Sequence, residues 1–187
     1  LNLFTAFDVT QQTEEDFDLD NASPASGALR KMCSKVIRLI EDELGGLPYS
    51  GIMAMCSSQF FDDLTAHAEF RANQLNWPAA DALSQRIARR RVDFGGITFE
   101  EYRGSVGAVK YVSDDKAHVF PIGVPDLFIS RYAPAEFWDT VNTVGLPRYV
   151  RQFPDAENPD SKRNLIVQSQ VIHLCTRPRT VIPARRT

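Results

Sequence analysis

The sequence predicts an α+β fold, because helix-like and strand-like patterns occupy separate segments. Residues 23–46 carry apolar side chains at steps of three and four, which is the spacing of an amphipathic helix. Residues 52–56 form a short apolar run, and residues 164–172 alternate between two faces, as strands do. Of the 187 residues, 43% are hydrophobic and 24% are charged, so the chain can build one large core or two small ones.

Charge, cysteine content and hydropathy argue against several classes of protein. The net charge is −3, which argues against a dedicated nucleic-acid binder. Cys33, Cys56 and Cys175 stand in apolar contexts, so we expect buried free thiols in a reducing cytosol. No apolar run approaches the ~18 residues of a membrane span, and we see no signal peptide. The first residue is Leu1 rather than Met, which suggests a fragment or a processed product.

The helix predicted over residues 23–46 has clear ends. Ser23 is a suitable N-cap, and Pro24 suits the first helical position because its missing N–H has no partner there. Gly45 and Gly46 can adopt the left-handed conformation that ends a helix. The apolar stripe, which we expect to pack in the core, consists of Leu29, Met32, Cys33, Val36, Ile37, Ile40 and Leu44. Charged residues lie mostly off the stripe: Arg30, Lys31, Lys35, Arg38, Glu41 and Asp42.

Residues 1–20 favour extended structure, so we expect an exposed ribbon or arm. Apolar and acidic residues alternate at its end, and the acidic run Glu14–Asp20 is either a solvated face or a cation site. After the long helix, residues 52–56 predict a buried strand, and Ser57 is the expected cap of a second helix. Its inner side is expected to carry Phe60, Phe61, Leu64, His67 and Phe70.

The middle of the chain predicts further helix and then a hairpin. An Ala-rich helical stretch is expected to Pro78, and a second one from Ala79 to about Arg90. A basic patch of Arg86, Arg89, Arg90 and Arg91 lies at the end of the second stretch. This patch either touches phosphates or acidic neighbours, or is a solvated helix end favoured by the dipole. Residues 92–112, with Gly95-Gly96, predict a hairpin or a pair of strands.

The remaining segments are less regular. Two prolines make residues 118–130 an irregular or edge segment rather than a central strand. Residues 133–138 resemble the start of a helix, residues 154–162 a loop tip, and residues 164–172 a strand.

Enzyme-like constellations are weak in this sequence. His173 and Cys175 fall on one side of a strand, but a structural zinc needs four ligands. Asp63 and His67 are four residues apart on a helix, which is more often a surface pair than a site. Cys56 lies in an apolar run where its thiol is inert. Glu100 and Glu101 point to opposite faces of a strand, and Gly95-Gly96 lacks the context of a phosphate loop. We therefore expect no catalytic, cofactor-binding or metal-binding residues, and no cofactor.

Several segments, in the same order along the chain, resemble one known family. The block 94–104, FGGITFEEYRG, is similar to a signature of the major capsid protein E family of lambda-like tailed phages and prophages. Further similar segments, quoted with their positions, are NLFTAFDVTQ at 2–11, YSG at 49–51, YAPA at 132–135, VNTVGLP at 141–147 and CTRP at 175–178. Asp8 stands where the family often has Gly, and residues 170–172 replace its Asn-Pro-Leu, which affects the expected turn geometry. The N-terminal portion of the family pattern has no counterpart here, so we expect the chain to be the C-terminal part of the capsid subunit.

The resemblance implies the tailed-phage major-capsid fold, with a peripheral domain, an axial domain and an arm called the E-loop. Residues 1–20 would be the returning strand of the E-loop. Residues 21–49 and 141–187 would form the peripheral domain, with the long helix as its spine and long strands beside it. Residues 50–140 would form the axial domain.

The function that the resemblance implies is structural: many copies self-assemble into an icosahedral head shell that encloses phage DNA. Two alternatives remain open, a cytosolic enzyme using a metal or thiol at Asp63, His67, His173 and Cys175, and a domesticated prophage remnant with a binding role. The expected partners are copies of the chain in hexamers and pentamers, packaged DNA without sequence preference, and scaffold, decoration and portal proteins, with no membrane. The expected location is the virion capsid, assembled in the host bacterial cytoplasm.

Two groups of residues are candidate sites under this reading. Phe4, Phe7 and Phe17 are predicted subunit contacts, because an isolated ribbon is marginally stable unless it lies on something. The basic patch of Arg86, Arg89, Arg90 and Arg91 is a candidate contact to DNA or to another subunit.

Overall fold

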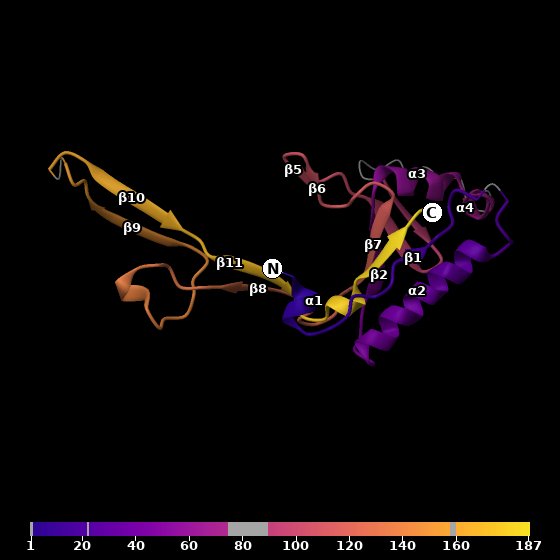
Figure 1. Ribbon diagram of the computed structural model, residues 1–187, viewed down its shortest axis with the longest axis horizontal. Coiled ribbons are helices and arrows are strands. Elements are labelled where there is room, and N and C mark those ends of the chain that lie inside the picture. Colours follow the sequence, from indigo (N-terminus) through magenta and orange to yellow (C-terminus); the bar gives the residue numbers. More distant parts are fainter. Residues whose placement is uncertain (1, 22, 75–89, 158–159) are drawn as a thin grey trace. The chain divides into compact units, whose positions relative to one another are not determined.

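The structure is a computed structural model that describes residues 2–21, 23–74, 90–157 and 160–187. The chain folds into two compact units, whose elements are labelled in Figure 1. The first, called the sheet unit below, comprises residues 1–125 and 177–187. The second, called the ribbon unit, comprises residues 126–176.

The sheet unit is built on a mixed six-stranded sheet in the order β1-β12-β7-β2-β4-β3. Its strands are β1 (Glu15–Asp16), β2 (Gly51–Cys56), β3 (Arg91–Phe94), β4 (Ile97–Glu101), β7 (Lys116–Ile122) and β12 (Ile182–Arg185). The pairs β1–β12 and β2–β4 are parallel, and the other pairs are antiparallel. Its helices are α1 (Leu3–Ala6), α2 (Ala28–Leu44), α3 (Ser58–Ala66), α4 (Ala68–Gln74) and the 3₁₀ turn η2 (Pro178–Thr180). A separate hairpin consists of β5 (Ser105–Val106) and β6 (Val109–Lys110).

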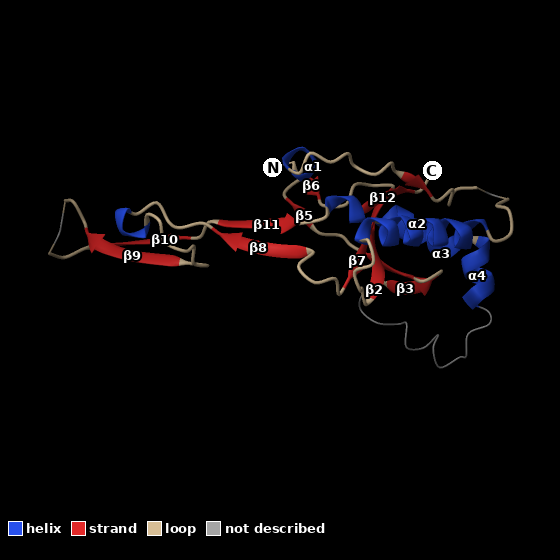
Figure 2. Cartoon of the chain, turned by 90° about the horizontal axis from the view of Figure 1, so that it is seen from below, coloured by secondary structure: helices blue, strands red, loops and turns tan. Residues whose placement is uncertain are grey.

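One face of this sheet forms the core. Ala54, Phe99 and Val119 lie opposite one another on neighbouring strands and are fully buried. Met53 and Met55, which point to the other face, are only half-buried. The buried residues of α2 and α3 belong to the same apolar cluster as the buried face, so both helices cover that side of the sheet (Figure 2). The prediction of an α+β protein is thus confirmed at the level of mixed α and β structure.

The predicted apolar stripe of α2 is confirmed. Five of its residues are buried, namely Leu29, Cys33, Val36, Ile40 and Leu44. The predicted end is also confirmed, because Gly45 adopts the left-handed conformation with φ 60°. The predicted start is wrong: the helix begins at Ala28, four residues after Pro24. Gly27 has φ 79°, and this left-handed residue interrupts any helix that would run through from Ser23.

Residues 1–20 do not form the predicted exposed strand. Residues 3–6 form the short helix α1, capped by the side chain of Asn2, and only β1 is extended within the sheet. The predicted alternation that follows is confirmed, since Phe17 and Leu19 are buried and Asp18 is exposed. The apolar side of this segment packs into the core of its own chain. The segment is therefore held in the sheet unit by β1, Phe17 and Leu19.

Phe17 is the centre of an aromatic cluster. Its ring centroid lies 5.5 Å from that of Phe60 on α3 and 6.4 Å from that of Phe99 on β4, edge-on to both rings. Phe60 and Phe99 are stacked with centroids 6.5 Å apart. Such edge-to-face and offset arrangements stabilise a core beyond the area they bury. The cluster joins the N-terminal segment, α3 and the sheet.

The predicted hairpin at residues 92–112 is confirmed in β3 and β4, which are joined by Gly95 and Gly96. Both glycines have positive φ, 59° and 87°, as a tight two-residue hairpin turn requires. A Cβ atom on Gly95 would lie 2.7 Å from the Cβ of Cys33. The Gly-Gly turn of the family-like block therefore lets α2 approach the sheet closely.

Gly95→Ala is expected to destabilise the chain by about 2–3 kcal/mol, because it adds backbone strain and a clash with α2. Gly107→Ala is the matched control, since Gly107 has the same φ of 59° but no atom within 4 Å of an added Cβ. It should lose only about 1 kcal/mol from strain. Denaturant unfolding measures both values; equal losses would contradict the close approach of Gly95 to Cys33.

The prediction that residues 118–130 avoid a central strand is wrong for β7, which lies between β12 and β2. Its register explains how Pro121 is tolerated. β12 pairs only with residues 116–119, so beyond Val119 the strand is paired on its β2 side alone. Pro121 therefore sits where β7 is locally an edge, which is where strands accept proline.

The ribbon unit consists of two antiparallel two-stranded ribbons. One pairs β8 (Phe128–Tyr132) with β11 (Val171–Cys175), and the other pairs β9 (Tyr149–Pro154) with β10 (Arg163–Gln168). The strand predicted at 164–172 is confirmed but interrupted after Gln168. The helix start predicted at 133–138 is wrong, because the only helical turn there is the 3₁₀ turn η1 (Trp138–Thr140).

The two units have boundaries that differ from the predicted domain boundaries. α2 shares one apolar core with α3 and with strands β2, β4 and β7, so no unit boundary falls between residues 49 and 50. Residues 177–187 leave the ribbon unit and join the sheet unit as η2 and β12. The names peripheral domain, axial domain and E-loop remain predictions.

Candidate functional site

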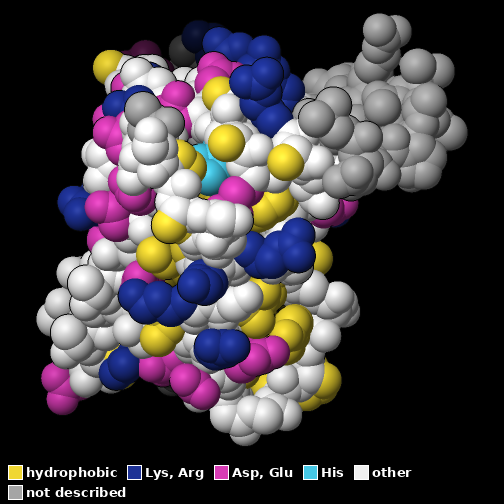
Figure 3. Space-filling model, turned by 90° about the vertical axis from the view of Figure 1, so that its right-hand side faces the viewer, with side chains coloured by type: hydrophobic (Ala, Val, Ile, Leu, Met, Phe, Trp, Pro, Cys, Tyr) yellow, Lys and Arg dark blue, Asp and Glu magenta, His cyan; other side chains and the backbone are white. Residues whose placement is uncertain are grey.

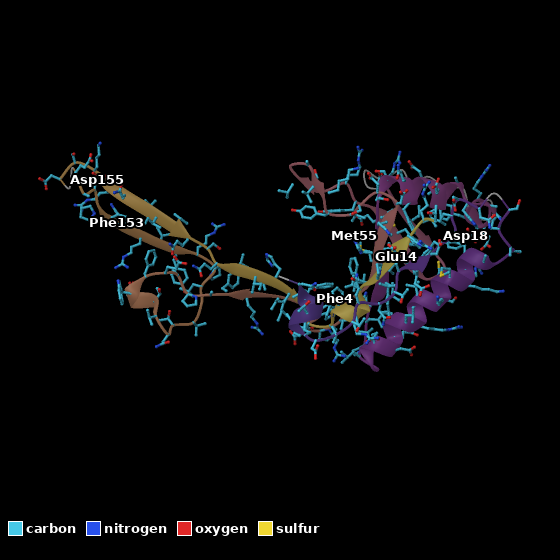
Figure 4. The ribbon with its side chains drawn as sticks, viewed as in Figure 1. Phe4, Glu14, Asp18, Met55, Phe153 and Asp155 are labelled. Atoms are coloured by element: carbon cyan, nitrogen blue, oxygen red, sulfur yellow. The ribbon has the colours of Figure 1, made fainter. Side chains whose placement is uncertain are left out.

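The most unusual surface of the chain is the exposed apolar side of the β9–β10 ribbon. Val150 pairs directly with Val167, and Leu165 pairs with Gln152, so these side chains share one face. Val150, Leu165 and Val167 are 65%, 64% and 58% exposed. Figure 4 shows the ribbon, with Phe153 near the end of β9 and Asp155 just beyond it.

The β8–β11 ribbon exposes apolar side chains as well. Phe128 and Tyr132 lie on one face, and Val171 pairs with Tyr132 on that same face. Ile172, on the opposite face, is also exposed. Both ribbons of the unit therefore present β-branched and aromatic side chains to the surroundings, where a self-sufficient two-stranded sheet would present polar ones.

The segment between β8 and β9 adds further exposed apolar residues and is held in place by polar contacts. Trp138 is 95% exposed and Val144 is 87% exposed. The Arg151 side chain lies over the Phe137 ring at 5.0 Å and pairs with Asp139 at 2.9 Å. Such contacts fix the loop that carries Trp138.

Two further contacts hold the second half of this segment. The Tyr149 hydroxyl accepts a hydrogen bond from the Leu146 backbone N–H and lies 3.3 Å from the Val144 carbonyl, to which it donates. A Cβ on Gly145 would lie 1.9 Å from the Tyr132 carbonyl oxygen, so the loop passes β8 in close contact. The exposed apolar residues thus stand on an ordered backbone.

This arrangement suits binding to protein rather than chemistry. Two-stranded ribbons are marginally stable alone in water, and each has backbone N–H and C=O groups on its outer edges that can pair with another strand. Exposed apolar faces of this kind gain free energy when another surface covers them. We call this set of exposed side chains the ribbon surface; it consists of Phe128, Tyr132, Trp138, Val141, Val144, Leu146, Val150, Phe153, Leu165, Val167, Val171 and Ile172.

The predicted aromatic contacts fall in different environments. Phe17 is 3% exposed inside the sheet unit, so its side chain is not available to another subunit. Phe4 is half-buried in α1. Phe7, just after α1, is 43% exposed. The prediction of a subunit contact therefore continues for Phe4 and Phe7 only.

The predicted basic patch is only partly described. Arg86 and Arg89 lie outside the described residues. Arg90 forms ion pairs with Asp62 at 2.9 Å and with Glu101 at 3.5 Å. Arg91 is exposed at the start of the edge strand β3. Because Arg90 is already paired within its own chain, it is a weaker candidate for phosphate than the sequence indicated.

The acidic run Glu14–Asp20 does not gather around a cation site. Three of its acids are held in ion pairs, Glu14 with Lys116, Glu15 with Lys35 and Asp16 with Arg185. In the described part of the chain, no group of three or more Asp, Glu, His or Cys side chains is placed to hold a metal ion. These acids instead tie the N-terminal segment to α2, β7 and β12.

The residues of the enzyme alternative are divided between the two units. Asp63 pairs with Arg186 at 2.8 Å, and the Nδ1 atom of His67 accepts the backbone N–H of Glu69. His173 and Cys175 belong to β11 in the ribbon unit, where the His173 ring lies 2.8 Å from the Ser130 hydroxyl. Within each unit, these side chains are held by contacts of their own.

All three cysteines are buried thiols outside any disulfide, as predicted. Burial raises the pKa of the Cys33 thiol to about 12 and also raises the pKa of Cys56. Both thiols are therefore protonated at neutral pH and are poor nucleophiles. This agrees with the expectation that the Cys56 thiol is inert.

Sequence reasoning missed the ribbon surface, although a signal was present. Leu165 and Val167 alternate with Ile166, so both faces of one predicted strand are apolar, which is typical of a strand buried on both sides. In the structure that strand belongs to a two-stranded ribbon, and Leu165 and Val167, which the pattern predicts to be buried, are exposed.

A family profile and a related phage protein agree with the resemblance. The profile of the family described as "Phage major capsid protein E" matches residues 1–186. The major capsid protein of Pseudomonas phage KPP10 is 29% identical over 157 residues, which are 76% of this chain and 44% of that protein. A solved structure described as a capsid protein of a prophage of E. coli CFT073 aligns with a TM-score of 0.48 and 15% identity, over 82% of this chain and 47% of the other. The chain thus spans less than half the length of these relatives.

None of the described helices is long and apolar enough to cross a bilayer.

Proposed function

Because the chain belongs to the phage major capsid protein E family, we propose that it is part of a shell protein that assembles with copies of itself. The family consists of structural capsid proteins, which are not a class of enzymes. The shell would be icosahedral, with hexamers and pentamers that enclose phage DNA, and its place would be the virion. Scaffold, decoration and portal proteins are further proposed partners, and the host cytoplasm is the proposed site of assembly.

The ribbon surface is the observation that carries this proposal. A chain that worked alone would gain nothing from leaving Trp138, Val144 and Leu165 exposed on an ordered backbone. In a closed lattice the same side chains can be covered by a neighbouring copy at every position. Contacts that are modest individually then sum over the whole shell.

We also propose an assignment of the two units to the two domains implied by the resemblance. The ribbon unit, with its paired extended strands, would belong to the peripheral domain, and the compact sheet unit would be the axial domain. On this assignment α2 is a helix of the axial domain rather than the spine, because its apolar stripe packs on the sheet of its own unit. Residues 1–20 would lead into the axial domain.

The test is expression of the complete product of the gene that encodes this chain, followed by electron microscopy of the purified protein. Closed shells, or rings of five or six copies, are the expected result. A protein that stays monomeric at high concentration, by sedimentation and by microscopy, would overturn the proposal.

A further inference from the structure

The charges on α2 run against the dipole of the helix. The first turn contains no acidic residue and the last turn no basic one. Arg30 and Lys31 stand near the positive N-terminal end, whereas Glu41, Asp42 and Glu43 stand near the negative C-terminal end. Both placements are unfavourable for an isolated helix. Helix stability therefore does not explain where these basic residues stand.

These basic side chains are exposed and largely unpaired. Arg30, Lys31, Lys35 and Arg38 are all exposed on the outward side of α2. Lys35 is held by Glu15 at 2.5 Å. Within the described residues, neither Lys31 nor Arg38 has an ion-pair partner. In Figure 3, which views the side of the chain where α2 lies, Lys and Arg side chains gather across the middle of the face.

Three of these cations, Arg30, Lys31 and Arg38, line a shallow depression on the surface of α2. Its lining consists of Gly27, Arg30, Lys31, Ser34 and Arg38. Three of these five residues are basic and none is acidic, in a chain whose net charge is −3. A local positive potential inside an acidic protein attracts an anionic ligand to this place.

The face suits a polyanion better than another protein surface. α2 is described throughout and has no large exposed apolar side chain, whereas the cores of protein interfaces are apolar and poor in Lys. Phosphate backbones are contacted by Lys, Arg and hydroxyl side chains such as these. From Arg30 to Arg38 the helix rises roughly 12 Å. Measured along the duplex axis, that length corresponds to about three or four phosphates of one strand, at ~3.4 Å each.

We propose that the outward face of α2 binds the phosphate backbone of nucleic acid through Arg30, Lys31 and Arg38, without preference for sequence. One strand would lie along this depression, beside Ser34. This inference deepens the proposed function, because it would make α2 a face that meets packaged DNA. Only the identity of the natural ligand, packaged DNA, rests on the proposed function. Binding of nucleic acid can be measured on the chain in solution.

The experiment is fluorescence anisotropy of a labelled 30-base-pair duplex of mixed sequence, titrated with the chain between 50 and 200 mM NaCl, roughly the range where phosphate contacts dominate. For the unmodified chain, the slope of log K against log salt should be about −3, one contact for each cation. The double variant K31Q/R38Q should reduce the magnitude of this slope by about 2. Charge-conserving K31R/R38K should retain it.

The matched control is R148Q/R163Q, which removes the same charge from exposed residues of the ribbon unit. It should leave the slope unchanged, and circular dichroism should show the same helix content for all variants. The inference is overturned if K31Q/R38Q binds like the unmodified chain, or if the control loses as much. It is also overturned if K31Q/R38Q weakens only self-association in sedimentation, because the face would then meet an acidic surface of another copy. Loss of particles with DNA binding intact would overturn the shell proposal instead.

Discussion

A chain in which Val150, Leu165 and Val167 are all replaced by threonine should fold normally but form few or no particles. The three side chains share the exposed face of the β9–β10 ribbon. Threonine is β-branched and is favoured in strands, so the ribbon should still form, but the substitution removes apolar surface. The lost burial of the three side chains together would cost about 2–4 kcal/mol at each contact between two copies. Because the loss repeats at every copy, the lattice amplifies it.

Particle counts in electron micrographs and sedimentation profiles measure this effect. Gln152→Thr is the control, since Gln152 lies opposite Leu165 on the same face but carries no apolar side chain. The control should assemble like the unmodified protein. Shells in normal yield from the triple variant would remove the β9–β10 face from the proposed contact.

The second large effect is on stability. Phe17→Ala should lower the free energy of unfolding by about 3–5 kcal/mol, because it empties the centre of the cluster with Phe60 and Phe99. Phe7→Ala is the natural comparison, since Phe7 is an exposed phenylalanine of the same segment. It should change stability by less than about 1 kcal/mol.

Denaturant unfolding of the two variants separates a core role from a contact role. A large loss for Phe17 and a small loss for Phe7 agree with the structure. If both variants lost little stability, the N-terminal segment would be a free arm, as the sequence had suggested, and its place in the sheet unit would be wrong.

Local patterns predicted the elements whose causes are local. The stripe of α2, its end at Gly45, the cap at Ser57 and the hairpin turn at Gly95-Gly96 were all predicted from neighbouring residues. In each case the physical cause lies within one or two turns of chain. Tertiary packing then acts in the same direction as the local preference.

Predictions failed where the cause lies far away in the sequence. β1 and β12 come from opposite ends of the chain, and their pairing draws Phe17 into the core. Pro121 looks incompatible with a central strand. The pairing of β12 with β7 reaches only Val119, so Pro121 lies beyond it. The start of α2 failed for a nearer reason, because Gly27 can adopt a left-handed conformation that a capping pattern does not reveal.

The candidate site could be predicted only in kind. The resemblance implied contacts between copies, but aromatic content alone selected Phe17, which is buried, together with Phe7, which is exposed. An apolar pattern such as that around Leu165 states that a strand is covered on both sides. It cannot state whether the cover is the same chain or another one.

Hydrogen exchange of the β9 and β10 amides, compared between assembled particles and dissociated subunits, tests the central claim most directly. If the ribbon surface is a contact between copies, amides in Tyr149–Pro154 and Arg163–Gln168 should exchange much more slowly in particles. Amides of the central strand β2 should be protected equally in both states. Particles in which the ribbon exchanges as fast as in free subunits would contradict the account.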